Sequence, residues 1–139
     1  MSEPFIQAVL GDIPYQVTLS NGVHRWLSDV NHSLGGVNSG PDPHQLLLSA
    51  LGACTAMTVS MYAKRKAMPL AGINVELNIV QEQRAPENRT EIMRTIEVHG
   101  ALDQAQRLRL LEVANACPIH RLLNARVDIR SQLAVKEQV

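Results

Sequence analysis

The sequence lacks an excess of charge of either sign. Its 139 residues carry 13 Lys and Arg against 13 Asp and Glu, so the formal net charge is zero. Without a basic surplus, there is no electrostatic basis for binding nucleic acid or an anionic membrane surface. The one short basic run, Lys64 to Lys66, is typical of the solvated end of a helix. We therefore expect neither nucleic acid nor a membrane among the partners.

We expect neither a targeting segment nor a membrane-spanning segment in this sequence. Residues 1–10 do not show the charged and then apolar pattern of a signal peptide. Ser49, Thr55 and Thr58 interrupt the longest apolar stretch, so we expect no membrane span. These absences predict a cytoplasmic protein.

Cysteine is scarce, and the two residues present, Cys54 and Cys117, lie far apart in the sequence. Because a reducing cytoplasm disfavours structural disulfides, they are either ordinary core residues or a working pair. A zinc site built on both cysteines and His120 would still need a fourth ligand. The other four histidines lie in scattered contexts, so we expect no metal site: these are His24, His32, His44 and His99.

No internal repeat or linker interrupts the chain, and its length and 45% hydrophobic content fit a single domain over residues 1–139. Short alternating apolar runs predict strands, and runs of period three to four predict helices. The expected order is βββ-α-ββ-αα-β, an α+β domain. The strands are expected at 5–10, 13–19, 23–29, 73–79, 92–98 and 127–133, and the helices at 43–68, 103–115 and 117–123.

The segment 43–68 is expected to form the central element of the fold. Asp42 is a good N-cap, and Pro43 suits the first helical position. Apolar residues cover most of the helix circumference, which predicts a buried, central helix and not a superficial one. Met61 and Tyr62 are accordingly predicted to lie in the core.

Local chemistry distinguishes the two thiols. Cys54 lies in the middle of an apolar helix with no positive charge within one turn, so its activating group must come from elsewhere in the fold or from a second subunit. Cys117 precedes Pro118 and opens a short helix, where backbone N–H groups would face its sulfur. His120 could add a charge or a hydrogen-bond donor. Local physics alone favours Cys117 as the more readily ionised thiol, and the alternative is that it is only a small capping residue.

Two separated motifs then carry a resemblance that covers nearly the whole chain. The first runs from Gly40 to Thr58 around Cys54, and the second is Ala116 to Arg121 around Cys117. Together and in this order, they resemble the signature of the OsmC/Ohr family of small thiol peroxidases.

The resemblance implies the OsmC-like fold, an intertwined homodimer with buried central helices, and active sites at the subunit interface. It implies that Cys54 attacks the peroxide and that Cys117 resolves the resulting sulfenic acid. Organic hydroperoxides are the implied substrates, and a dithiol, often lipoyl-based in the family, is the implied reductant. No metal or flavin is implied.

The sequence departs from the family where the attacking cysteine is activated. The family Glu that follows the helix-starting Pro is missing, because this position reads His44-Gln45. Arg25, the only arginine before the helix, is the candidate for the family Arg. His44 is a second candidate, although ten helical residues, about 15 Å, separate it from Cys54 in one chain. The missing Glu leaves a second interpretation open, in which the protein binds a small hydrophobic molecule or senses redox state slowly.

Overall fold

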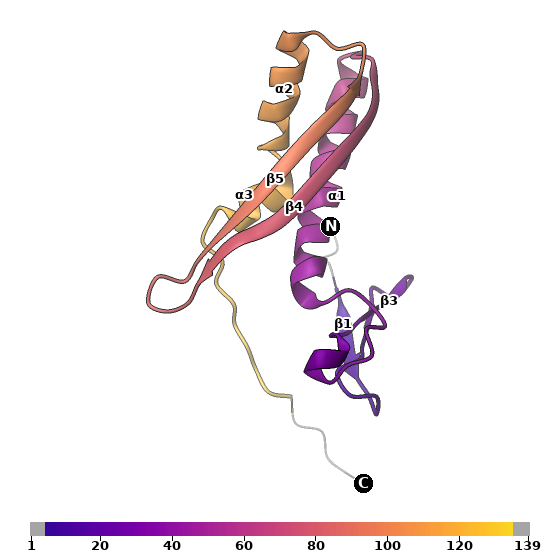
Figure 1. Cartoon of the computed structure of the whole chain (residues 1–139), viewed down its shortest axis with the longest axis vertical. Coiled ribbons are helices and arrows are strands. Elements are labelled where there is room, and N and C mark those ends of the chain that lie inside the picture. The colour runs from indigo at the N-terminus through magenta and orange to yellow at the C-terminus, as the bar shows by residue number, and fades with distance from the viewer. Residues whose placement is uncertain (1–4, 135–139) are drawn as a thin grey trace. The chain divides into compact units, whose positions relative to one another are not determined.

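The computed structural model describes residues 5–134 and divides into two compact units (Figure 1). The first unit contains residues 5–53 and 76–95, and the second contains residues 54–75 and 96–134. The helix α1 (Pro43–Arg65) and the antiparallel pair β4 (Leu70–Gln83) and β5 (Arg89–Gly100) contribute residues to both. The single domain over residues 1–139 stays a prediction.

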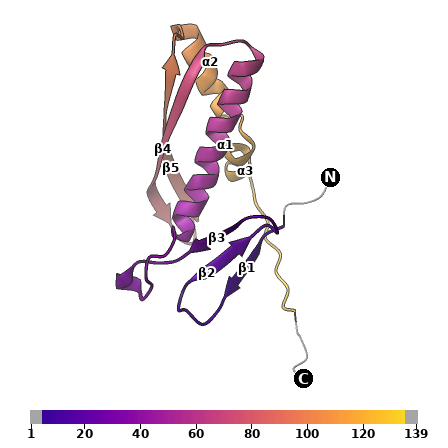
Figure 2. The same cartoon turned by 90° about the vertical axis from the view of Figure 1, so that its right-hand side faces the viewer.

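A three-stranded antiparallel sheet opens the first unit (Figure 2). Its strands are β1 (Gln7–Leu10), β2 (Val17–Ser20) and β3 (Arg25–Ser28), in that spatial order. The turn before β3 is closed by the Asn21 side chain, which accepts hydrogen bonds from two backbone N–H groups downstream at 2.9 and 2.6 Å. The predicted hairpin and third strand are confirmed.

A buried carboxylate organises the loop between this sheet and α1. Asp29 is 1% exposed and accepts hydrogen bonds from the Ser39 hydroxyl at 2.7 Å and the Ser39 N–H at 3.0 Å. Backbone N–H groups of Val30 and Val37 also donate to it. The Ser39 hydroxyl, followed by the backbone donors, lowers the pKa of Asp29 from 3.8 to about 2. This loop, which includes the 3₁₀ turn η1 (His32–Leu34), therefore folds around a fixed negative charge before α1 begins.

Asp42 caps the start of α1, as predicted, and forms a capping box with Gln45, which was not predicted. The Asp42 carboxylate accepts from the Gln45 N–H at 2.8 Å, and the Gln45 side-chain oxygen accepts from the Asp42 N–H at 2.9 Å. Both groups would otherwise be unpaired donors at the helix end. Gln45 thus has a structural role in this chain.

The strands β4 and β5 form a long hairpin with one inward face. Residues along β4 alternate between half-buried and exposed, with Ile73, Val75, Leu77 and Ile79 on the inward row. This period of two is typical of a sheet that is covered on one side. Both predicted strands are confirmed and extend several residues beyond the predicted ends.

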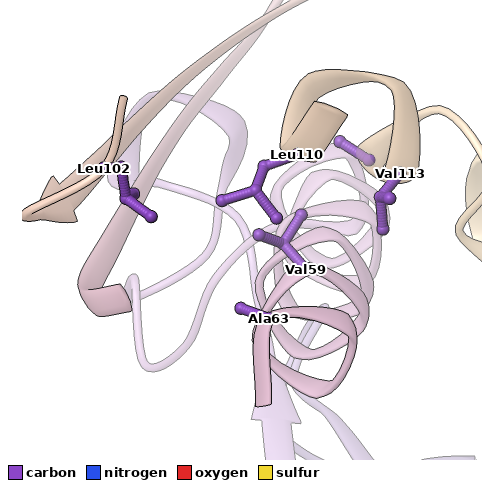
Figure 3. Packing of buried hydrophobic residues seen from close by; sticks show 6 residues of the cluster. Val59, Ala63, Leu102, Leu110 and Val113 are labelled. Carbon is purple, nitrogen blue, oxygen red and sulfur yellow. The ribbon is translucent and has the colours of Figure 1, made fainter. Parts of the chain in front are cut away.

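The core of the second unit joins α1, the hairpin and α2 (Gln104–Ala114) (Figure 3). Leu110 projects from α2 toward Val59 and Ala63 on α1, and Val113 lies one turn further along α2. Asp103 caps α2 with a full capping box, which confirms the predicted start of this helix. Hydrophobic side chains of the hairpin pack against the same cluster: Leu70, Ile73, Ile96 and Val98.

One face of α1 is buried and the opposite face is open within the chain. Leu51, Thr55, Val59 and Ala63 recur every four residues and are buried. Met57 and Met61 on the other side are each 60% exposed. Within one chain, the predicted central helix is therefore buried along one face only, and the prediction that Met61 lies in the core is wrong there. Apolarity around a helix predicts burial only if neighbours cover every face.

By length and composition, α1 is apolar enough to cross a membrane, so the sequence argument that no segment qualifies is wrong. The interrupting hydroxyl residues are too few to offset the apolar ones. A single such helix is weak evidence for a membrane span, because core helices of soluble proteins have the same character.

The predicted last strand, 127–133, is also wrong, because residues 125–134 contain no strand. Val127, Ile129 and Leu133 do alternate with polar residues, but they are strongly exposed, Ile129 by 85% and Leu133 by 90%. A strand requires a paired edge as well as an alternating pattern. The last regular element of the described chain is the short helix α3 (Pro118–Leu123), which was predicted.

Candidate functional site

The second unit contains both cysteines, and Cys117 lies at the N-cap of α3. Its backbone is extended, with φ −65° and ψ 144°, and Pro118 takes the first helical position, where no N–H is needed. The sulfur accepts a hydrogen bond from the N–H of His120 at 3.3 Å. The prediction that backbone N–H groups face this sulfur is confirmed.

The hydrophobic core fixes the position of Cys117. Its N–H donates to the carbonyl of Ala114 at 3.3 Å, and the N–H of Ala116 donates to the carbonyl of Val113 at 2.9 Å. Val113 and Ala114 are both members of the core cluster. The thiol of Cys117, which is 0% exposed, is therefore held against the packed end of α2.

Helix α1 meets Cys117 through Thr55. The Thr55 hydroxyl lies 3.9 Å from the Cys117 sulfur, and both residues are fully buried. Thr55 directly follows Cys54, which places the Cys117 sulfur within about 10 Å of the Cα atom of Cys54. Both thiols are free. Two cysteines that are distant in the sequence are thus brought into one small region of the second unit.

Cys54 lies at the edge of the buried face of α1. Consecutive residues turn about 100° around a helix, so Cys54 points away from the Thr55 direction and toward the margin of the exposed face. Its side chain is half-buried, and its sulfur lies 4.0 Å from the Thr58 hydroxyl one turn later. When Cys54 is ionised, this hydroxyl can donate to the thiolate. Of the two thiols, Cys54 is the one that a solute can reach.

His120 has a side-chain partner on the same short helix. The amide nitrogen Nδ2 of Asn124 lies 3.0 Å from the ring nitrogen Nε2 of His120. Sequence reasoning identified His120 but missed Asn124 and Thr55. The i, i+4 spacing of His120 and Asn124 was an available signal for the first contact, whereas the contact with Thr55 depends on tertiary packing.

The two other candidates for activating Cys54 belong to the first unit. Arg25 begins β3, and its side chain is exposed. His44 lies in the first turn of α1, where its Nε2 is 3.0 Å from the Glu82 carboxylate of β4. Both side chains of this pair are more than half exposed, so the pair contributes little to stability. Their part in activation stays a prediction.

Residues 5–134 contain no group of three or more His, Cys, Asp or Glu side chains that could hold a metal ion. The zinc site considered from the sequence would therefore lack ligands around Cys54, Cys117 and His120.

Comparisons with known proteins agree with this architecture. A family model described as OsmC-like protein matches residues 36–132. No curated protein sequence matches the chain. The crystal structure of an OsmC-like protein from Mycoplasma pneumoniae is similar, with a TM-score of 0.75 and 21% identity over 88% of this chain and 87% of that one.

Two further similar structures carry functional names. An organic hydroperoxide resistance protein OsmC from Legionella pneumophila has a TM-score of 0.67 and 20% identity, over 92% of this chain and 93% of that one. The organic hydroperoxide resistance protein OhrB of Bacillus subtilis has a TM-score of 0.62 and 20% identity, over 89% and 92%. The similarity to these structures shows the α+β OsmC-like fold. Because the family model matches residues 36–132, the chain belongs to the OsmC-like protein family.

Proposed function

We propose that this protein is a cysteine-based peroxidase that reduces organic hydroperoxides in the cytoplasm. The observation that carries the proposal is the 3.9 Å contact between the Cys117 sulfur and Thr55, the residue next to Cys54. It keeps a buried thiol close to an accessible one, which is the arrangement that a two-step thiol reaction requires. The family membership and the names of two structural neighbours support the same reaction.

The difference in exposure assigns the two roles. A hydroperoxide must reach the attacking sulfur, and Cys54 is half-exposed whereas Cys117 is fully buried. We therefore take Cys54 as the attacking thiol. Exposure supports this assignment, since a thiol that no substrate can reach does not react.

The proposed cycle has three balanced steps. The Cys54 thiolate attacks the terminal peroxide oxygen, the O–O bond breaks, and Cys54 becomes a sulfenic acid. The departing alkoxide takes up from solvent the proton that the Cys54 thiol released on ionising, and it leaves as an alcohol. The Cys117 thiol then displaces that oxygen as water and forms the Cys54–Cys117 disulfide. A dithiol reductant, of which lipoyl groups are one class, reduces the disulfide and is itself oxidised.

The open face of α1 supports two further parts of the proposal. It is lined by apolar side chains, among them Met57 and Met61, and Cys54 lies at its margin. A second copy of the chain would cover this face, as the resemblance implies, and would leave an apolar approach for the alkyl group of a hydroperoxide. The exposed alternating residues between Val127 and Leu133 would also gain a partner in such a homodimer.

The neutral Gln45 favours a second function. Its side chain caps α1 and carries no charge, so the carboxylate expected from the family is missing there. A thiol that lacks this activation would react slowly, and the protein would then be a redox sensor or a binding protein for a small hydrophobic molecule. The two functions differ in the rate at which Cys54 is oxidised.

Stopped-flow oxidation of the reduced protein by cumene hydroperoxide tests both the peroxidase function and the alternative function of a sensor or binding protein. We expect rapid formation of a Cys54 sulfenate, loss of turnover with dihydrolipoamide in Cys54→Ser, and over-oxidation of Cys54 in Cys117→Ser. Slow oxidation combined with tight binding of an apolar ligand would support the second function. If Cys54 of the unsubstituted protein remains a thiol after treatment with the hydroperoxide, the peroxidase proposal is refuted.

The groups that activate Cys54 are tested in the same assay. Arg25→Ala and His44→Ala should each slow sulfenate formation if they act on Cys54. His99→Ala is the matched control for the histidine, because His99 also pairs with a nearby carboxylate, that of Glu97 at 2.9 Å. A variant that oxidises at the unsubstituted rate removes its residue from the mechanism.

A further inference from the structure

The hydroxyl of Thr58 contacts the sulfur of Cys54 along α1. The two residues are four apart in the sequence, so their side chains lie on the same side of the helix, and Oγ1 of Thr58 is 4.0 Å from Sγ of Cys54. Both side chains are half-buried. A hydroxyl group therefore reaches the proposed reacting atom from within the same element of the fold.

The Thr58 hydroxyl differs from another hydroxyl of the same helix. Ser and Thr side chains inside helices often donate to the backbone carbonyl one turn earlier, as Ser49 does to the carbonyl of Gln45 at 2.6 Å. For Thr58, in contrast, the Cys54 sulfur is the only hydrogen-bond partner of the hydroxyl within residues 5–134. The hydroxyl proton of Thr58 is thus available to the sulfur, because no backbone acceptor holds it.

Ionisation of Cys54 gives this contact a direction. Between a neutral thiol and a hydroxyl, either group can be the donor. A thiolate has no proton and can only accept, so the hydroxyl must then donate to it. The contact therefore stabilises the thiolate more than the thiol. Because the thiolate is the nucleophile, such a contact increases reactivity at a pH where most of the thiol is still protonated.

We propose that Thr58 is a catalytic residue, a hydroxyl donor that stabilises the Cys54 thiolate before it attacks the peroxide. This inference rests on the proposed attacking role of Cys54. Neutral Gln45 stands where the family carboxylate is expected. In the part of the chain that the structure describes, no charged side chain hydrogen-bonds to the Cys54 sulfur. A donor on the same helix supplies part of the missing activation.

The attacking step balances with Thr58 unchanged. The S–H bond of Cys54 breaks and its proton passes to solvent, while the O–H bond of Thr58 stays intact. An electron pair of the thiolate then forms the S–O bond to the terminal peroxide oxygen, and the O–O bond breaks. The Cys54 sulfur is oxidised to the sulfenic level, and the peroxide is reduced to an alkoxide that takes a proton from solvent.

Alkylation of Cys54 by iodoacetamide tests the donor without any peroxide. Its rate is measured across a range of pH by mass spectrometry of the Cys54 peptide. Thr58→Val keeps the branched shape and removes the hydroxyl, so we expect its profile to move to higher pH and its rate at neutral pH to fall about tenfold, the effect of one lost hydrogen bond to a charged group. Thr58→Ser should restore most of the rate. Ser60→Ala removes an exposed hydroxyl from the same helix and is the matched control, which should leave the profile unchanged.

The alkaline plateau of the profile separates ionisation of Cys54 from damage to the fold. There the thiol is fully ionised in every variant, so Thr58→Val should react at least as fast as the unsubstituted protein. Identical profiles for these two proteins would overturn the inference. Equal slowing by Thr58→Val at neutral pH and on the plateau would also overturn it. So would a Thr58→Ser profile displaced as far as that of Thr58→Val, because loss of packing alone would explain that result.

A single-turnover assay tests the same donor with a peroxide. After a single addition of cumene hydroperoxide, sulfenate formation and disulfide formation are followed separately by trapping with a 1,3-diketone and by mass spectrometry. At neutral pH, we expect Thr58→Val to form the Cys54 sulfenate about tenfold more slowly than the unsubstituted protein. Disulfide formation should then proceed at the unsubstituted rate, because Cys117 is the attacking thiol of that step. Equal slowing of both steps would contradict the inference.

Different results refute the peroxidase and the role of Thr58. If no sulfenate forms on Cys54, the peroxidase proposal is refuted, and the alkylation profiles still decide whether Thr58 stabilises the thiolate. If sulfenate forms at the same rate in Thr58→Val and in the unsubstituted protein, and their alkylation profiles are identical, the peroxidase stands and the role of Thr58 is refuted.

Discussion

Replacing Leu110 by alanine tests whether one core supports both the stability of the second unit and the position of Cys117. Leu110 is 1% exposed and packs against Val59 and Ala63 on α1. Truncation removes most of the side chain from a site lined by two helices, which cannot easily move together to fill the space. Buried Leu→Ala changes of this kind cost about 2–5 kcal/mol. We expect a value near the middle of that range, about 3 kcal/mol.

Urea denaturation followed by circular dichroism measures the change in the free energy of unfolding. Leu108→Ala is the matched control, since it makes the same deletion on the same helix at a residue that is 53% exposed. We expect the control to cost less than about 1 kcal/mol. All proteins are compared at one protein concentration, because association would add to apparent stability. A difference of less than about 1 kcal/mol between the two variants would refute the reasoning.

The same substitution has a chemical consequence. The N–H of Cys117 is held by the carbonyl of Ala114, one helical turn after Leu110. Loosening this end of α2 should broaden the range of positions available to the Cys117 sulfur. Leu110→Ala should therefore slow disulfide formation more than sulfenate formation in the single-turnover assay, and Leu108→Ala should change neither. Equal slowing of both steps in Leu110→Ala would point to general loss of structure.

Two further predictions concern the loop that leads into α1. Because the pKa of Asp29 is lowered from 3.8 to about 2, its stabilising effect is present above pH 3.8 and is lost as the pH falls toward 2. Asp29→Asn should therefore lower the melting temperature at neutral pH. The difference from the unsubstituted protein should shrink as the pH falls from 3.8 to about 2. A difference that stays constant over this range would contradict the stabilising role of the Asp29 carboxylate. A methyl group at Gly40 would overlap the carbonyl of Leu27, so Gly40→Ala should lower the free energy of unfolding by about 1–3 kcal/mol. Gly11→Ala is the control and should lower it far less, because nothing lies within 4 Å of the added methyl group. Equal losses of unfolding free energy in urea denaturation would contradict the prediction.

Local sequence signals predicted most of the fold correctly because they act over a few residues. Asp42 and Asp103 each cap the helix that follows them, and Pro118 starts α3 where its missing N–H has no cost. The alternation around Ile73 gave the inward face of β4. Each of these features is determined within one turn or one strand, where propensity and hydrogen bonding agree.

The failures arose where structure depends on distant neighbours. Met61 is apolar and lies in an apolar helix, yet it is 60% exposed because no element within residues 5–134 covers that face. The segment 127–133 has the alternation of a strand but no strand forms there. In both cases, the apolar pattern shows only that the segment is able to be buried or paired. Whether it is buried or paired depends on a neighbouring element of the fold or on a partner chain.

The same limit applied to the site. Sequence reasoning found Cys54, Cys117 and His120, whose types and motifs are informative by themselves. From its N-cap position, sequence reasoning favoured Cys117 as the more readily ionised thiol. The structure confirms the N-cap position, and sequence reasoning could not include the burial that closes this sulfur to substrate. Thr55 was missed because a buried threonine in an apolar helix gives no sign of which sulfur its hydroxyl will meet.

The geometry of α1 separates the two steps of the proposed reaction. Thr55 faces the Cys117 sulfur, and Cys54 is turned about 100° from it around the helix, toward the open face. Cys54 can therefore meet a peroxide without moving, whereas disulfide formation requires the two Cα atoms to approach within about 7 Å and the sulfurs to align. The element best suited to move is α3, because it is short and none of its six residues is buried, although Cys117 itself is held at the end of α2. Cys117 leads this short helix, so a small displacement of its first turn would carry the buried sulfur out along α1, and resolution becomes the step that depends on protein motion.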